Sequence, residues 1–145
     1  MKKVFIMIGC PGSGKTTWVE KQKLPSVSRD KVRIDLGYCK PGEKYLGTKE
    51  EEYKVTKECE KLRAEFECGG IDFAIDDTNT KIGRRKVLES EFRSLGYHVV
   101  GVWMRTDLGI CLERRKCEIP EEVITRMWES CQSVDPSEFD ELIEV

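Results

Sequence analysis

The chain has 145 residues, 36% of which are charged, and a formal net charge of −2. This length suits one hydrophobic core, so we expect a single domain over residues 1–145. The near-neutral balance excludes the overall basic field of many nucleic-acid binders, so local basic residues would have to hold any anionic ligand.

Cysteine usage and hydropathy indicate a cytoplasmic protein. The seven cysteines include no CxxC pair, and His98 is the one histidine, which argues against a zinc site. We expect reduced thiols, with disulfides as the alternative. The apolar run Val4–Ile8 is too short for a signal peptide, and no stretch approaches the ~20 apolar residues needed to cross a membrane.

The first elements follow from apolar runs and their breakers. Val4–Ile8 is continuously apolar and ends at a glycine, which is typical of a strand buried on both faces. A helix is predicted over about Lys15–Lys23, ended by Pro25, and a short strand at Val27–Ser28. The Pro-Gly pair predicts a loop over residues 39–47.

The later elements alternate between helix and strand. Apolar residues spaced by four, three and four predict an amphipathic helix over residues 49–67, with Val55, Cys59, Leu62 and Phe66 on one face. After it we expect a strand at 71–75, a helix at about 81–95 that presents Leu88, Phe92 and Leu95, a strand at 97–104, a helix at about 108–114, a helix from about Pro120 that buries Val123, Ile124, Met127 and Trp128, and a last strand at 141–145. This order predicts an α/β fold with a mostly parallel central sheet of four to five strands and helices on both faces.

Residues 9–16, GCPGSGKT, match the phosphate-binding pattern GxxxxGK[ST] between a predicted strand and a predicted helix. In such a loop the backbone N–H groups face phosphate oxygens, the lysine reaches the β- and γ-phosphates, and the hydroxyl meets Mg²⁺. We therefore expect a P-loop NTPase fold that binds ATP or another nucleoside triphosphate with Mg²⁺. The predicted phosphate-binding residues are Gly9, Pro11, Gly12, Ser13, Gly14, Lys15, Thr16 and Thr17.

Two acidic clusters follow predicted strands, where ligands of an open α/β sheet gather. In DDTN, Asp76 is expected to hold the metal through a water, beside Thr16, while Asp77 and Thr78 face the acceptor. The alternative is an Asx-turn over residues 77–79 that caps the next helix, and Asn79 is expected to be that cap.

The segment RDKVR, residues 29–33, favours a kinase over a motor protein. A hydroxyl acceptor needs a carboxylate to take its proton, and Asp30 is the candidate base. Arg33 lies three residues on and would share its helical face, suited to gripping an acceptor phosphate. Asp35 is the rival base.

Residues 108–120 are the expected lid. The basic segment ERRK within it offers Arg114 and Arg115 to neutralise charge on the transferred phosphoryl group. The alternative for this segment is a solvated basic turn.

Taken in order, the segments MKKVFIMIGCPGSGKTTW, SRDKVR, IDDTN followed by GRR, and IPEEVITRMW resemble the phage-type polynucleotide 5′-hydroxyl kinases. The resemblance implies ATP-dependent phosphorylation of the 5′-hydroxyl end of RNA or DNA. It implies Lys15 and Thr16 at the donor phosphates, Asp30 as general base, Arg33 on the acceptor 3′-phosphate, Asp77 lining the acceptor site, and Arg114 or Arg115 as the lid arginine.

The chain departs from that family pattern in three respects. Its lid is shorter, serine replaces the usual asparagine before Arg29, and no room is left for the phosphatase or ligase domain that many members carry. The alternative functions are a kinase for the hydroxyl of a metabolite or antibiotic, and a regulatory nucleotide-binding switch.

Overall fold

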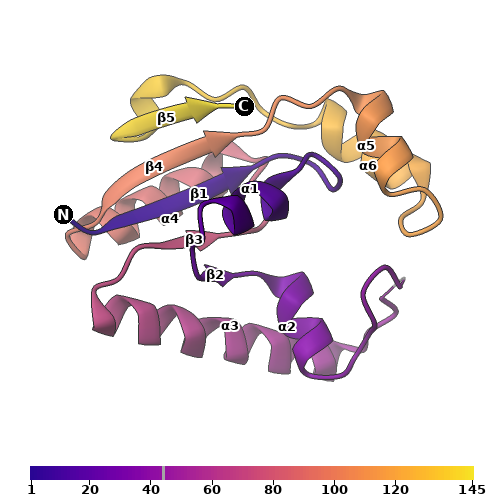
Figure 1. Ribbon diagram of the computed structural model, residues 1–145, viewed down its shortest axis with the longest axis horizontal. Helices are drawn as coiled ribbons and strands as arrows, with labels where there is room; N and C mark the ends of the chain where they lie inside the picture. The colour runs from indigo at the N-terminus through magenta and orange to yellow at the C-terminus, as the bar shows by residue number, and fades with distance from the viewer. Residues whose placement is uncertain (44) are drawn as a thin grey trace.

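The computed structural model describes residues 1–43 and 45–145 as an α/β fold (Figure 1). In chain order the elements are β1 Lys3–Ile8, α1 Lys15–Lys21, β2 Ser26–Val27, α2 Arg29–Asp35, α3 Lys49–Gly69, β3 Phe73–Ile75, α4 Ile82–Ser94, β4 His98–Trp103, α5 Leu108–Arg114, α6 Glu121–Glu129, the 3-10 helix η1 Pro136–Glu138, and β5 Glu141–Glu144. No helix among the described residues has the length and apolar character needed to span a bilayer.

The sheet has five strands in the order β2-β3-β1-β4-β5, and every neighbouring pair is parallel. The predicted parallel sheet with helices on both faces is confirmed. Figure 1 shows α1 in front of the sheet and α4 behind it, with α5 and α6 together beyond the carboxyl ends of β1 and β4. Because all strands run the same way, the loops that carry the polar motifs meet at this one edge.

Two apolar layers cover the sheet. On one side, buried β-strand residues such as Phe73 pack with Leu88 and Phe92 of α4, and Leu62 and Phe66 of α3 join them. On the other side, Val19 and Trp18 of α1 pack with residues of β1, β3 and β4. These layers fix α1 and α4 against the strands whose ends carry the site.

Several predicted boundaries and contacts were wrong by small amounts. Helix α1 ends at Lys21, and Lys23 has a positive φ of 55°. Trp128 was expected to be buried but is 42% exposed, and Leu95, expected on the apolar face of α4, is 44% exposed. Residue 44 of the predicted 39–47 loop lies outside the described residues, and the rest of that loop has no helix or strand.

Ser28 was expected to end a strand, and that expectation was wrong. Strand β2 stops at Val27, and Ser28 caps helix α2 by accepting a hydrogen bond from the backbone N–H of Lys31 at 3.3 Å. Asp30 and Arg33 therefore belong to a helix that starts immediately after the strand.

Candidate active site

The loop between β1 and α1 is wrapped tightly around its own lysine. The Lys15 ammonium donates to the carbonyls of Gly9 at 2.9 Å and Cys10 at 3.0 Å. Burial lowers the pKa of Lys15, although the charge of Asp76 opposes this effect. Gly12 has a φ of +83°, and a Cβ there would lie 2.7 Å from the Cys111 carbonyl, so both backbone and space require glycine.

Thr16 and Asp76 bring two oxygen ligands together at the end of this loop. The Thr16 hydroxyl donates to Asp76 Oδ2 at 2.8 Å. Burial raises the pKa of Asp76, and the Thr16 hydrogen bond and the charge of Lys15 oppose that rise. Mg²⁺ commonly takes one or two such protein oxygens and completes its shell with phosphates and water, so this pair fits the predicted metal site.

One cleft of about 1260 Å³ gathers nearly all of the predicted site. It is lined by Pro11, Gly12, Ser13, Gly14, Lys15, Thr16, Thr17, Asp30, Arg33, Asp76, Asp77, Thr78, Arg114 and Arg115. Gly9 is absent from its wall, but the Gly9 N–H donates to the Thr78 carbonyl at 2.9 Å and joins the phosphate loop to DDTN. Asp35, the rival base, does not line the cleft, which favours Asp30.

Asp30 and Arg33 form a pair on one face of α2. Arg33 Nη1 lies 2.8 Å from Asp30 Oδ1, with the Arg33 side chain 20% exposed and the Asp30 side chain 77% exposed. Asp30 is therefore presented to the cleft, while Arg33 is held against the protein.

Glu52 of helix α3 holds Arg33 and was missed from the sequence. Its carboxylate accepts from Arg33 Nε at 2.9 Å and Nη2 at 3.2 Å, and from Arg29 Nη2 at 2.7 Å. Hydrogen bonds from Arg33 and Arg29 lower the pKa of Glu52 to about 2 despite burial. In the sequence, Glu52 is one of several glutamates at a helix start, and nothing there singles it out.

Two residues of the DDTN segment, Asp77 and Asn79, have different surroundings. Burial raises the pKa of Asp77, and the neighbouring Arg29 and Arg84 partly oppose the shift. The prediction that Asn79 caps α4 was wrong: its amide donates to the Met7 carbonyl at 2.8 Å, and Lys81 occupies the cap position without a side-chain bond. Asn79 thus ties DDTN to β1 instead.

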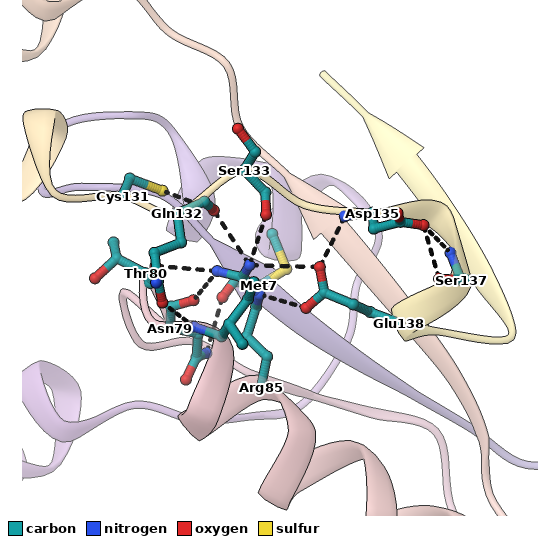
Figure 2. A network of polar contacts seen from close by, with 11 residues as sticks. Met7, Asn79, Thr80, Arg85, Cys131, Gln132, Ser133, Asp135, Ser137 and Glu138 are labelled. Atoms are coloured by element: carbon teal, nitrogen blue, oxygen red, sulfur yellow. Dashed lines mark hydrogen bonds and ion pairs between the residues drawn. The ribbon is translucent and has the colours of Figure 1, made fainter.

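Arg85 is a fully buried arginine that sequence reasoning also missed. Figure 2 shows its guanidinium among the carbonyls of Asn79, Thr80, Gln132 and Ser133 at 3.0–3.2 Å. Its Nε also lies 2.9 Å from Glu138 Oε1 in η1. The residue therefore joins the end of DDTN to the segment before β5. Its position beside Arg84 on a helix gave no signal of burial.

Helix α5, at the start of the expected lid, rests on the phosphate loop. Arg114 Nη1 donates to the Gly12 carbonyl at 3.1 Å, and the Sγ atoms of Cys10 and Cys111 lie 3.4 Å apart in the interior. Arg115 pairs with Glu118, with Nε and Oε2 2.9 Å apart. Both predicted lid arginines reach the cleft, and the geometry leaves both as candidates.

A comparison with protein families decides the family of the chain. The AAA domain family matches residues 4–133, which is most of the chain. The chain belongs to this AAA domain family. Its P-loop, its parallel sheet and its helices on both faces are those of a P-loop NTPase-like kinase fold.

Solved structures with this fold include proteins of different functions. The AAA domain resembles a chain in the Pnkp1/Rnl/Hen1 RNA repair complex. The two are 20% identical, and the match has a TM-score of 0.75 and covers 90% of the AAA domain. A second structure of that complex matches with 19% identity and a TM-score of 0.65 over 81% of this chain. A gluconokinase from Sinorhizobium meliloti 1021 matches with 14% identity and a TM-score of 0.56 over 99% of this chain and 81% of its own.

These identities establish the fold alone. The AAA domain spans 44% and 40% of the chains that it matches in the two RNA repair structures. The shared part is therefore the fold, and any reaction must be inferred from the residues of the cleft.

Proposed function

We propose that this AAA domain is an ATP-dependent polynucleotide kinase that transfers the γ-phosphate to the 5′-hydroxyl end of RNA or DNA. One observation carries the proposal: the Asp30–Arg33 pair lines the same cleft as the phosphate loop. A carboxylate beside a planar cation suits an acceptor that has a hydroxyl to activate and a phosphate to grip.

The donor side of the cleft would be built by the phosphate loop. Backbone N–H groups of the loop and the Lys15 ammonium would bind the β- and γ-phosphates of ATP. Thr16, and Asp76 through a water, would hold Mg²⁺, which when bound neutralises charge on the phosphates. Arg114 or Arg115 would meet the charge of the transferred group as α5 covers the donor.

The acceptor side would be built by α2 and DDTN. Asp30 takes the proton of the 5′-hydroxyl while the hydroxyl oxygen bonds to the γ-phosphorus. The bond between the γ-phosphorus and the oxygen that bridges it to the β-phosphate breaks, and ADP is released. Arg33 grips the 3′-phosphate of the acceptor, while Asp77 and Thr78 line the site for its terminal nucleotide.

The fold comparisons support this proposal without selecting it. Two of the similar structures are of the Pnkp1/Rnl/Hen1 RNA repair complex, and a third is of a gluconokinase. The alternative is therefore a kinase for the hydroxyl of a small molecule. A polynucleotide is favoured because Arg33, beside Asp30 in the cleft, suits an acceptor that already carries a phosphate next to its hydroxyl.

A transfer assay separates the candidates. ATP labelled on the γ-phosphate is incubated with a 5′-hydroxyl oligonucleotide, with a panel of small alcohols that includes gluconate, or with buffer alone. Label on the oligonucleotide supports the proposal. Label on a small alcohol alone, or phosphate released at an equal rate in buffer, overturns it.

The base assignment has a matched control within α2. Asp30→Ala should remove at least two orders of magnitude of kcat while leaving ATP binding intact, because general base catalysis contributes about 10²–10⁴-fold. Asp35→Ala removes an exposed carboxylate of the same helix from outside the cleft and should retain activity. The reverse pattern would make Asp35 the base.

A further inference from the structure

The basic residues of the cleft differ in what holds them. Arg29 and Arg33 are bound by Glu52, Lys15 and Arg114 by loop carbonyls, and Arg115 by Glu118. Lys81 donates to the Ser130 carbonyl at 3.0 Å, and Lys21 and Arg84 line the cleft without a hydrogen bond or ion pair to another residue that the structure describes. Of these two, Arg84 is the one with the planar fork that suits phosphate. Its guanidinium is thus not held by an ion pair within the described residues, at the wall of a site for anions.

Helix α4 holds Arg84 in place through its neighbour. Arg85 is fully buried and donates to six acceptor atoms in five residues (Figure 2). Successive residues of a helix are turned by about 100°, so anchoring Arg85 fixes the direction in which Arg84 leaves the helix. Arg84 is exposed and lines the cleft, away from the buried side of the helix that holds Arg85.

Arg84 lies on the helix that directly follows DDTN, whose Asp77 and Thr78 line the same cleft. Arg84 comes from the helix after β3, whereas Arg33 comes from the helix after β2. The two arginines therefore approach the acceptor from separate elements. The proposed function assigns the 3′-phosphate to Arg33, which leaves Arg84 for another phosphate.

We infer that Arg84 binds a backbone phosphate of the acceptor strand beyond the phosphate held by Arg33, and so sets a preference for polynucleotides over single nucleotides. This inference rests on the proposed function. Arginine suits the task because its planar fork binds phosphate oxygens in pairs. Because Arg84 forms no ion pair with a described carboxylate, a phosphate that binds it would replace water rather than an ion-pair partner.

A length series tests this site. The acceptors are a nucleoside 3′-monophosphate and an eight-nucleotide single strand with a 5′-hydroxyl, each assayed with wild type, Arg84→Ala, Arg84→Lys and Lys86→Ala. Lys86 is an exposed cation of the same helix that lies outside the cleft wall, which makes it the matched control. Arg84→Ala should raise KM for the octamer about tenfold more than KM for the monomer, the loss expected for one charged phosphate contact.

Salt dependence gives a second readout that a folding defect would not move. Each phosphate contact on a single strand contributes about −0.7 to the slope of log affinity against log salt. Arg84→Ala should reduce the slope for the octamer by about that amount, Arg84→Lys should keep it, and Lys86→Ala should leave it as in wild type. The slope is measured by fluorescence anisotropy of a labelled octamer, so this readout does not require turnover.

The outcomes separate the two proposals. Equal KM changes for both acceptors in Arg84→Ala, or an unchanged octamer slope, overturn the Arg84 site. A wild type that binds the octamer with an Arg84-dependent slope but transfers no label to it overturns the proposed kinase activity and retains the phosphate site.

Discussion

The guanidinium of Arg33 is held by two oxygens of Glu52, at 2.9 and 3.2 Å, from a helix 19 residues further along the chain. Arg33 also pairs with Asp30 of its own helix and lies over the Tyr45 ring, 4.8 Å from its centroid, and its side chain is 20% exposed. Its orientation toward the cleft therefore depends on α3 as well as on its own helix.

Removing this support should weaken use of the acceptor. Glu52→Gln should raise KM for an acceptor with a 3′-phosphate about tenfold, because a hydrogen bond to a charged group is worth about 1.5–3 kcal/mol. An acceptor that lacks the 3′-phosphate should change less, and steady-state kinetics on the two acceptors measures the difference. An equal rise in KM for both acceptors would show that Glu52 does not orient Arg33.

The same carboxylate should make stability depend on pH. The pKa of Glu52 is lowered from 4.5 to about 2 by Arg33 and Arg29, so its stabilising effect is full above about pH 4.5. That effect is lost as pH falls from 4.5 toward 2. Urea unfolding should show Glu52→Gln less stable than wild type at about pH 7, with the gap narrowing at about pH 3. Glu65→Gln, an exposed position of α3, is the control and should show no such gap.

Asp76 should govern the requirement for Mg²⁺. Asp76→Asn should raise the Mg²⁺ concentration for half-maximal activity about 10–100-fold, the usual effect of losing a partner around a metal. Asp35→Asn, outside the cleft, is the control. A magnesium titration at fixed ATP measures the shift, and an unchanged midpoint in Asp76→Asn would place the metal elsewhere.

Arg85 should matter first for stability. Arg85→Met leaves the 8% exposed Glu138 carboxylate without its partner and should lower the free energy of unfolding by about 3–5 kcal/mol. Arg84→Ala changes an exposed neighbour and should stay within about 0.5 kcal/mol of wild type. Urea denaturation measures both, and similar midpoints for the two variants would show that the buried network contributes little.

Cysteine reactivity should follow burial. Burial and the bond with Cys111 raise the pKa of Cys10 to about 12, so its thiolate is scarce near neutral pH. Cys68 and Cys117 are exposed and should react with iodoacetamide first. Mass spectrometry of peptides after short labelling gives the order, and early labelling of Cys10 would mean that α5 leaves the phosphate loop readily.

The parts of this protein that depend on local pattern could be predicted from its sequence. The P-loop requires glycines and a lysine at fixed spacing, and apolar runs separated by helical periods predict the parallel sheet. The network residues could not be found in this way. Glu52 and Arg85 acquire their partners from segments 19 and 53 residues away, and their types alone are typical of an exposed helix surface.

Asn79 shows why even a local prediction can be wrong. Its type and position suit a helix cap, and the amide bonds instead to the carbonyl of Met7, 72 residues away in the chain. An asparagine can satisfy either partner, and the folded arrangement of β1 beside β3 decides between them.

Lys15 and Arg114 already bond to carbonyls of Gly9, Cys10 and Gly12. An ammonium and a guanidinium both have more N–H donors than these carbonyls occupy, so Lys15 and Arg114 keep donors that could bind a nucleotide phosphate. The carbonyl bonds orient the two cations before a nucleotide arrives, so less side-chain freedom is lost when it binds.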